Sequence, residues 1–177
     1  MSLFIVFIMV LSVLGVALNY GLEDSESVKF KNTKFKQVNN LWVTYKDKEK
    51  ITITSQPDYL ESIQVPDISL SDINKQKIYF TTNPEDAIPR DALLDIQTNI
   101  VPKLNSLAIA CTQDSEKCAD LPLKTCSDAS PSNPIIQLQI TETPSITFNN
   151  NCLLIQSPRD SFTMYVDALI LKLHGLE

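Results

Sequence analysis

The chain has 177 residues and a formal net charge of −6 at neutral pH, with 21 acidic against 15 basic side chains. This acidic balance argues against a nucleic-acid binder, which would carry a basic surface, so no nucleic-acid partner is predicted. The three glycines stand at positions 15, 21 and 175, which excludes glycine-rich phosphate loops and dinucleotide-binding fingerprints.

Residues 1–22, MSLFIVFIMVLSVLGVALNYGL, carry no charged side chain. A membrane-spanning helix needs about 20 mostly apolar residues, and residues 3–22 reach that length. We therefore expect residues 1–22 to be a transmembrane signal anchor whose partner is the lipid bilayer. A cleaved secretory signal with a site at Gly15-Val16-Ala17 is the first alternative. A buried soluble helix is the least favoured, because the segment has no polar face.

The orientation of this anchor is contested within the sequence. Lysines at positions 29, 31, 34 and 36 follow the apolar segment, and by the positive-inside rule they favour a cytoplasmic domain. The cysteines described below favour the outside, which is the orientation we predict. Residues 23–33 are charged and polar and are predicted to be a tether, and residues 34–177 a single soluble domain large enough for its own core.

Residues 35–38, 41–45 and 50–54 alternate apolar and polar side chains, which predicts the strands of a small antiparallel meander. Trp42 is expected to pack in its core. The lysines at 29–36 and 46–50 form a basic strip. Its simpler interpretation is the solvated side of an edge hairpin, and its alternative is a phosphate or anionic-lipid site.

The middle of the chain predicts a β-α-β unit with a parallel strand pair. One or two helical turns are expected over 57–63, a loop over 65–75 and a strand over 77–82. Pro89 then begins a helix with Leu93, Ile96 and Ile100 on its buried face, and Pro102 ends it. A further strand is predicted over 107–112.

Residues 113–134 are predicted to be a loop, followed by strands over 135–140, 145–148 and 152–156. The last helix begins at Ser157-Pro158-Arg159-Asp160, which resembles a capping box, and ends at Gly175. Its buried stripe is Phe162, Val166, Leu169 and Leu173. The predicted fold class is α+β: a mixed sheet covered on one face by two helices and preceded by the meander.

The four cysteines, Cys111, Cys118, Cys126 and Cys152, follow an apparent export signal in an even number, which indicates two disulfides. Among the three possible connectivities we favour Cys111–Cys118 with Cys126–Cys152. Reduced buried thiols, a zinc site and redox chemistry are the alternatives. A zinc site is disfavoured because no two cysteines are spaced as closely as in C-x2-C.

The sequence contains no recognisable catalytic constellation. His174, the single histidine, is interpreted as a cation near a helix C-terminus rather than a general base. Asp86, Asp91 and Asp95 offer ligands for a hard cation, but a solvated helix face explains them more simply. We predict no catalytic, cofactor-binding or metal-ligating residue and no cofactor.

From Lys77 onward the chain reads IYFT, a helix, AIACT, DLPLKTC, a strand pair, NNCLLIQ and a helix ending KLHGLE. This order, with the N-terminal anchor, resembles a group of small archaeal proteins that carry a signal anchor and cysteine blocks. The resemblance implies an extracytoplasmic archaeal protein. It transfers no activity and no catalytic residue.

These features predict a membrane-anchored extracytoplasmic domain with a non-enzymatic binding or envelope role and a protein partner of unknown identity. One alternative is an anchored hydrolase or thiol-redox factor whose site is assembled from scattered residues. Another is an accessory subunit of a membrane complex that packs through Ser12 and Gly15.

Overall fold

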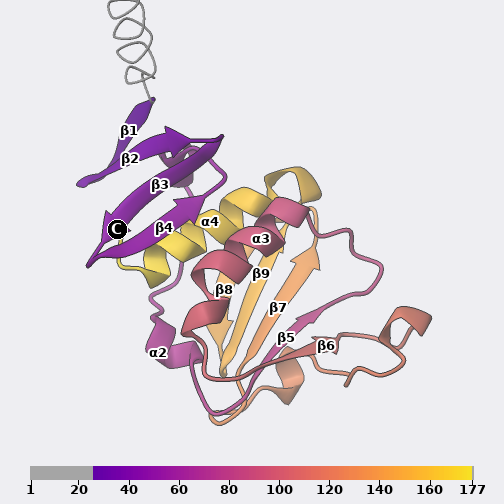
Figure 1. Ribbon diagram of the computed structural model, residues 1–177. Helices are drawn as coiled ribbons and strands as arrows, with labels where there is room; N and C mark the ends of the chain where they lie inside the picture. The colour runs from indigo at the N-terminus through magenta and orange to yellow at the C-terminus, as the bar shows by residue number, and fades with distance from the viewer. Residues whose placement is uncertain (1–25, 177) are drawn as a thin grey trace, which may run out of the picture.

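The computed structural model describes residues 26–176 and contains two sheets joined through a layer of helices (Figure 1). In chain order the elements are β1 (Ser27–Phe30), β2 (Thr33–Val38), β3 (Leu41–Lys46), β4 (Glu49–Ile53), α2 (Leu70–Ile73), β5 (Ile78–Thr82), α3 (Arg90–Asn99), β6 (Leu107–Cys111), β7 (Ile135–Ile140), β8 (Ser145–Asn149), β9 (Cys152–Ser157) and α4 (Phe162–Leu173). The predicted anchor lies outside the described residues. Between residues 26 and 176 no helix is both long and apolar enough to cross a bilayer.

The first sheet is an antiparallel meander in the order β1-β2-β3-β4, which confirms the predicted meander. The structure differs from the predicted tether, residues 23–33, because this segment contains β1. Val28 and Phe30 of this strand pack against the core. The alternation of apolar and polar residues covers only four positions among charged residues, which is too short to predict a strand. Left-handed backbone at Asn39 and Asn40 makes the tight β2–β3 hairpin turn.

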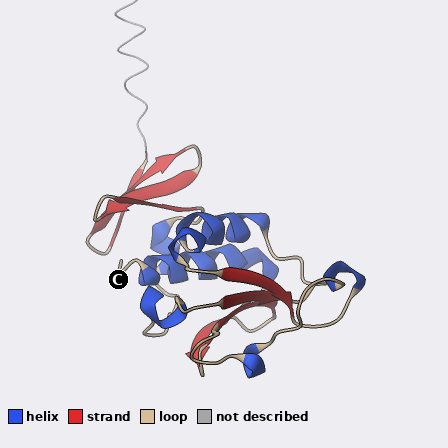
Figure 2. Cartoon of the chain, turned by 60° about the horizontal axis from the view of Figure 1, so that its bottom comes forward, coloured by secondary structure: helices blue, strands red, loops and turns tan. Residues whose placement is uncertain are grey.

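The second sheet has the order β6-β5-β7-β9-β8, with β8 antiparallel at one edge and the other strands parallel. Helices α3 and α4 lie on one face of it, between the two sheets (Figures 1 and 2). The predicted parallel β-α-β unit is present as β5-α3-β6. The chain then returns to the opposite side of β5 as β7, so the strand order reverses at β5.

The final helix matches its predicted packing but not its predicted start. Its four predicted core residues, Phe162, Val166, Leu169 and Leu173, are all buried. The capping box does not form, because Ser157 belongs to β9 and a 3-10 turn, Arg159–Ser161, precedes α4. Gly175 ends the helix with a left-handed φ of 65°, as predicted.

The helical turn expected over 57–63 is present as a 3-10 turn, Pro57–Leu60. The segment 65–75 differs from the predicted loop, because it contains α2. The Asp72 carboxylate caps α2 by accepting a hydrogen bond from the Ser69 N–H at 2.8 Å.

Helix α3 buries Ile96 and Ile100 as predicted, but not Leu93. Leu93 is 39% exposed, and the buried side chains are Ala92, Asp95, Ile96 and Asn99. Asn99 bonds both backbone groups of Thr52 on β4, accepting from its N–H at 3.1 Å and donating to its carbonyl at 2.7 Å. The amide thus replaces a missing neighbour strand at the free edge of β4 and joins the two sheets.

Candidate functional site

The four cysteines form two disulfides on the second sheet, in the pairing favoured from the sequence. Cys111 and Cys118 close the loop after β6, with their Cα atoms 6.3 Å apart. Cys126 is bonded to Cys152 of β9, with a Cα separation of 5.3 Å. Because all four cysteines are paired, none is left as a thiol for redox chemistry. Each bond contributes about 2–4 kcal/mol, mainly by restricting the unfolded chain.

Residues 122–128, called the strap below, cross the sheet face opposite the helices. The strap first pairs with the end of β6, where the Lys124 N–H donates to the Cys111 carbonyl at 2.8 Å. It then meets β5, where the Thr81 hydroxyl donates to the Lys124 carbonyl at 2.8 Å. These two contacts fix the path of the strap over β6 and β5.

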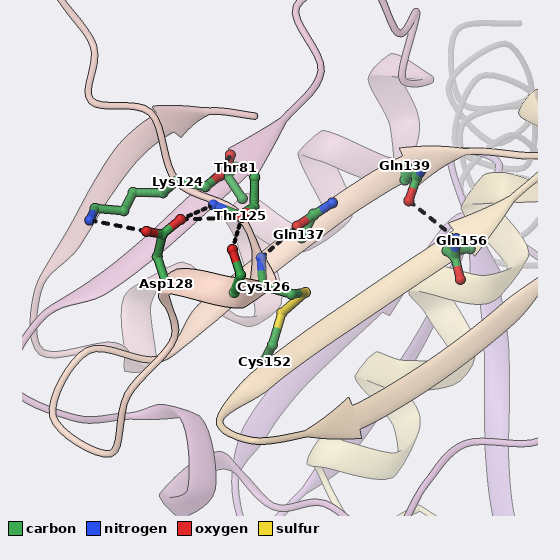
Figure 3. The surroundings of a disulfide bond; sticks show 10 residues. Thr81, Lys124, Thr125, Cys126, Asp128, Gln137, Gln139, Cys152 and Gln156 are labelled. Carbon is green, nitrogen blue, oxygen red and sulfur yellow. Dashed lines mark hydrogen bonds and ion pairs between the residues drawn. A yellow bond between two sulfur atoms is a disulfide. The ribbon is translucent and has the colours of Figure 1, made fainter. Parts of the chain in front are cut away.

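The second half of the strap is fixed to β7 and β9 (Figure 3). The Cys126 N–H donates to Gln137 Oε1 on β7 at 3.0 Å, and the disulfide joins the same residue to Cys152. Asp128 accepts from the Thr125 N–H at 2.9 Å, and this hydrogen bond holds the pKa of its carboxyl below the ordinary value. The strap is therefore anchored to β5, β6, β7 and β9 in turn.

A polar pocket of about 270 Å³ lies where β5, β6 and β7 end, at the point where the strand order reverses. In open sheets with parallel strands, ligands bind in the crevice outside the carboxyl ends of the strands at such a switch point. Its polar lining comes from the loops and strand ends: Asn83, Asp86, Thr112, Gln113, Gln137 and Gln139. This pocket is the candidate functional site.

Three of the lining amides are held by hydrogen bonds that leave their NH2 groups for a ligand. Gln137 Oε1 accepts from a backbone N–H, and so does Asn83 Oδ1, from Glu85 at 3.0 Å. Gln139 Oε1 accepts from Gln156 Nε2 at 3.1 Å (Figure 3). Since each oxygen faces a donor, the orientation of each amide is fixed, and the hydrogen bonds found within residues 26–176 use none of the three NH2 groups.

The loops that frame the pocket are tied to one another. Asp86 Oδ2 accepts from the Ile140 N–H at 2.9 Å, which caps β7 beyond the end of β5. At the rim, Lys117 lies 3.2 Å from the Glu85 carboxylate and also donates to the Pro84 carbonyl. The Cys111–Cys118 disulfide closes the loop after β6, which contains Lys117. One wall of the pocket is therefore covalently restrained.

The acidic residues singled out from the sequence do not converge. Asp86 caps β7, Asp91 is exposed on α3, and Asp95 faces β4. Within the described part of the chain, no group of three or more His, Cys, Asp or Glu side chains could hold a metal ion.

His174 is not the cation we expected at the helix C-terminus. Burial is the largest effect that lowers the pKa of this imidazole, and the nearby Lys103 lowers it further, which favours the neutral form of the ring. Nε2 lies 3.4 Å from the Asn99 carbonyl, and the side chain is 6% exposed. His174 therefore packs at the joint between the sheets, remote from the pocket-lining residues named above.

A buried carboxyl pair, Asp95 and Asp167, was missed from the sequence. Asp95 accepts from the Thr54 N–H at 3.2 Å, and Asp167 from the Ser55 N–H at 2.8 Å. Burial raises the pKa of both, and the neighbouring Asp95 raises that of Asp167 further. Asp167 Oδ1 is buried without a hydrogen-bond partner among the described residues, which favours the protonated form of this carboxyl. With Asp167 fully buried, the pair is a structural joint.

The pocket amides also escaped sequence reasoning. The run IIQLQI places Gln137 and Gln139 on one face of β7, between buried residues that point to the helices. The alternation of apolar and polar residues in β7 was the signal that could have revealed them. It indicates that one face of this strand is polar. Asn83 lies in a loop, where the sequence offers no comparable pattern.

Comparisons with known proteins returned no match to any family model, to any curated protein or to any solved structure. The geometry of the pocket and the disulfides is therefore the basis for the function proposed below.

Proposed function

We propose that this chain is a non-enzymatic, membrane-tethered domain that faces an oxidising compartment and binds a neutral, oxygen-rich ligand such as a saccharide. The apolar residues 1–22 support the tether. The two disulfides support the oxidising compartment, because cytosolic thiols are kept reduced. An extracytoplasmic position also agrees with the resemblance to anchored archaeal proteins.

The observation that carries the ligand class is the set of fixed amides at the switch point. Binding sites orient their ligands with a few well-placed polar groups, and groups that are already ordered lose little entropy on binding. The NH2 groups of Asn83, Gln137 and Gln139 are donors, which suit hydroxyl or carbonyl oxygens. The only ionisable group among the six polar lining residues is Asp86, so a neutral ligand fits better than an anion.

The same lining favours binding over turnover. A hydrolase needs a nucleophile and a positioned base within hydrogen-bond reach of each other. Thr112 supplies a hydroxyl, but Asp86 already serves as the cap of β7. His174, the single histidine, packs at the joint between the sheets.

The test is a titration of the full chain, held in phosphatidylcholine nanodiscs, with two neutral probes, maltotetraose and chitotetraose. We expect saturable shifts of the Gln137 and Gln139 side-chain amide resonances with at least one probe. Gln139→Glu removes a donor without changing the shape and should weaken binding about tenfold. Gln76→Glu, on an exposed turn, is the matched control and should not change it.

Two results would contradict the proposal. One is the absence of a saturable shift with both probes. The other is the release of shorter sugars from either probe, because a chain that cleaves its ligand is an enzyme rather than a binding domain.

A further inference from the structure

The outward face of the four-stranded sheet, called the lysine face below, gathers ammonium groups from all of its strands except β3. Register places Lys29 opposite Lys34 and Tyr45 opposite Lys50. Lys36 lies opposite Val43, one outward position further along β2. Lys34, Lys36, Tyr45 and Lys50 line one hollow of about 470 Å³.

These lysines are not neutralised within the described part of the chain. Like charges directly opposite each other on neighbouring strands destabilise a sheet. Yet Lys29, Lys34, Lys36 and Lys50 make no salt bridge with any residue from 26 to 176, and the outward strand positions carry no acidic residue. By contrast, four other lysines form ion pairs: Lys103 with Glu49, Lys117 with Glu85, Lys124 with Asp128 and Lys172 with Asp67.

The same face exposes apolar side chains beside the charges. Val38 and Leu41, opposite each other at the hairpin tip, are 46% and 36% exposed, and Tyr45 is 67% exposed. Lysine stems lie along apolar surface while their ammonium groups stay in water, and tyrosine is enriched at membrane–water interfaces. Ammonium groups mixed with exposed Tyr, Val and Leu suit an anionic lipid surface better than a soluble polyanion, which would leave the apolar groups uncovered.

The position of the sheet in the chain brings this face near the membrane. Ser27, the first residue of β1, follows Leu22 by five residues, which span at most about 18 Å when extended. Both overall views place the four-stranded sheet at the end of the molecule where the described chain begins (Figures 1 and 2). The strands that carry the pocket lie beyond the helix layer.

We infer that the lysine face docks on anionic lipid headgroups of the membrane that holds residues 1–22. This inference rests on the proposed tether. Docking gives Lys29, Lys34 and Lys36 a role other than fixing membrane topology, since they belong to a folded sheet rather than to an unstructured flank. It also fixes the domain so that the pocket is held away from the bilayer.

The experiment uses the full chain in nanodiscs of phosphatidylcholine alone or of an equal mixture with phosphatidylglycerol. A trace of lipid with a gadolinium headgroup broadens the NMR signals of groups near the surface. We expect broadening of the outward residues of β2 and β3 in the mixed discs, and its loss in phosphatidylcholine discs or in high salt.

Two double variants of equal charge separate docking from net charge. Each lysine removed lowers the ratio of docked to undocked chain about fivefold, so Lys34→Glu with Lys50→Glu should abolish the broadening. Lys75→Glu with Lys77→Glu, outside the four-stranded sheet, should preserve it. Unchanged resonances of the pocket amides show that both variants fold.

The contradicting outcomes are distinct. Equal broadening in the two kinds of disc, or in the two double variants, overturns docking but does not contradict the tether. A chain that does not co-elute with phosphatidylcholine discs overturns the tether and docking together. If the lysine face is not broadened but heparin shifts its resonances, the face binds a soluble polyanion and the inference is wrong.

Discussion

At the scale of single residues, the joint between the sheets contains the buried carboxyl pair Asp95 and Asp167. The two carboxyls accept hydrogen bonds from consecutive backbone N–H groups at the end of β4, and burial raises the pKa of both. Two neighbouring buried charges of the same sign repel each other in a medium of low dielectric, which favours protonation of one of the groups. This proton links the stability of the joint to pH.

The first prediction concerns the sign of that linkage. Because both folded pKa values are raised, the folded chain holds a proton that the unfolded chain releases above the ordinary carboxyl range. The stability from the pair is complete below the ordinary carboxyl pKa and is lost as pH rises through the raised values. Urea denaturation should therefore show a free energy of unfolding that falls as pH rises above the ordinary carboxyl pKa.

Asp167→Asn tests this, because an amide keeps the oxygen for Ser55 and supplies a permanent donor for Asp95. The variant should have a flatter pH profile and exceed the unmodified chain in stability near neutral pH. Asp114→Asn, in an exposed loop, should leave the slope as it is. A slope that Asp167→Asn does not change would assign the linkage to other groups.

At the scale of elements, helix α3 completes the edge of β4. Asn99 makes two hydrogen bonds to Thr52, and Asp95 adds one to Thr54. An unpaired strand edge exposes backbone groups that must be covered, and a polar stripe on a helix covers them here. This arrangement explains why Asp95 and Asn99, rather than Leu93, face inward.

We predict that Asn99→Ala lowers the free energy of unfolding by about 2–4 kcal/mol, because it strands two buried backbone groups. Gln97→Ala, on the exposed face of the same helix, should change it by less than about 0.5 kcal/mol. Denaturant unfolding of the two variants side by side makes the measurement. Equal losses would show that the Asn99 side chain is not what joins α3 to β4.

Periodicity alone predicted the meander, the parallel β-α-β unit and the buried stripe of α4, because each buries one regular face. It failed where partners far apart in sequence decide the structure. Leu93 fits an apolar helix stripe, but the edge of β4 required Asp95 and Asn99 instead. The pocket is lined by loops that disulfides and single hydrogen bonds hold at one edge of the sheet. No local sequence pattern predicts that these loops lie together.

At the scale of the whole molecule, the two sheets divide the proposed tasks. The four-stranded sheet, which follows residues 1–22 along the chain, carries the lysine face, and the five-stranded sheet carries the pocket and both disulfides. The helix layer and the Asp95–Asp167 joint hold the two at a fixed distance. Under the proposed function, this arrangement presents the pocket to the compartment outside the membrane.

The most direct test of this account is to count reactive thiols on the chain recovered from carbonate-washed membranes, with alkylation before and after reduction. The account predicts that the chain stays in the membrane pellet with no reactive thiol before reduction and with Cys111, Cys118, Cys126 and Cys152 all reactive after it. A chain that washes off the membranes, or one with free thiols before reduction, would contradict a tethered domain in an oxidising compartment.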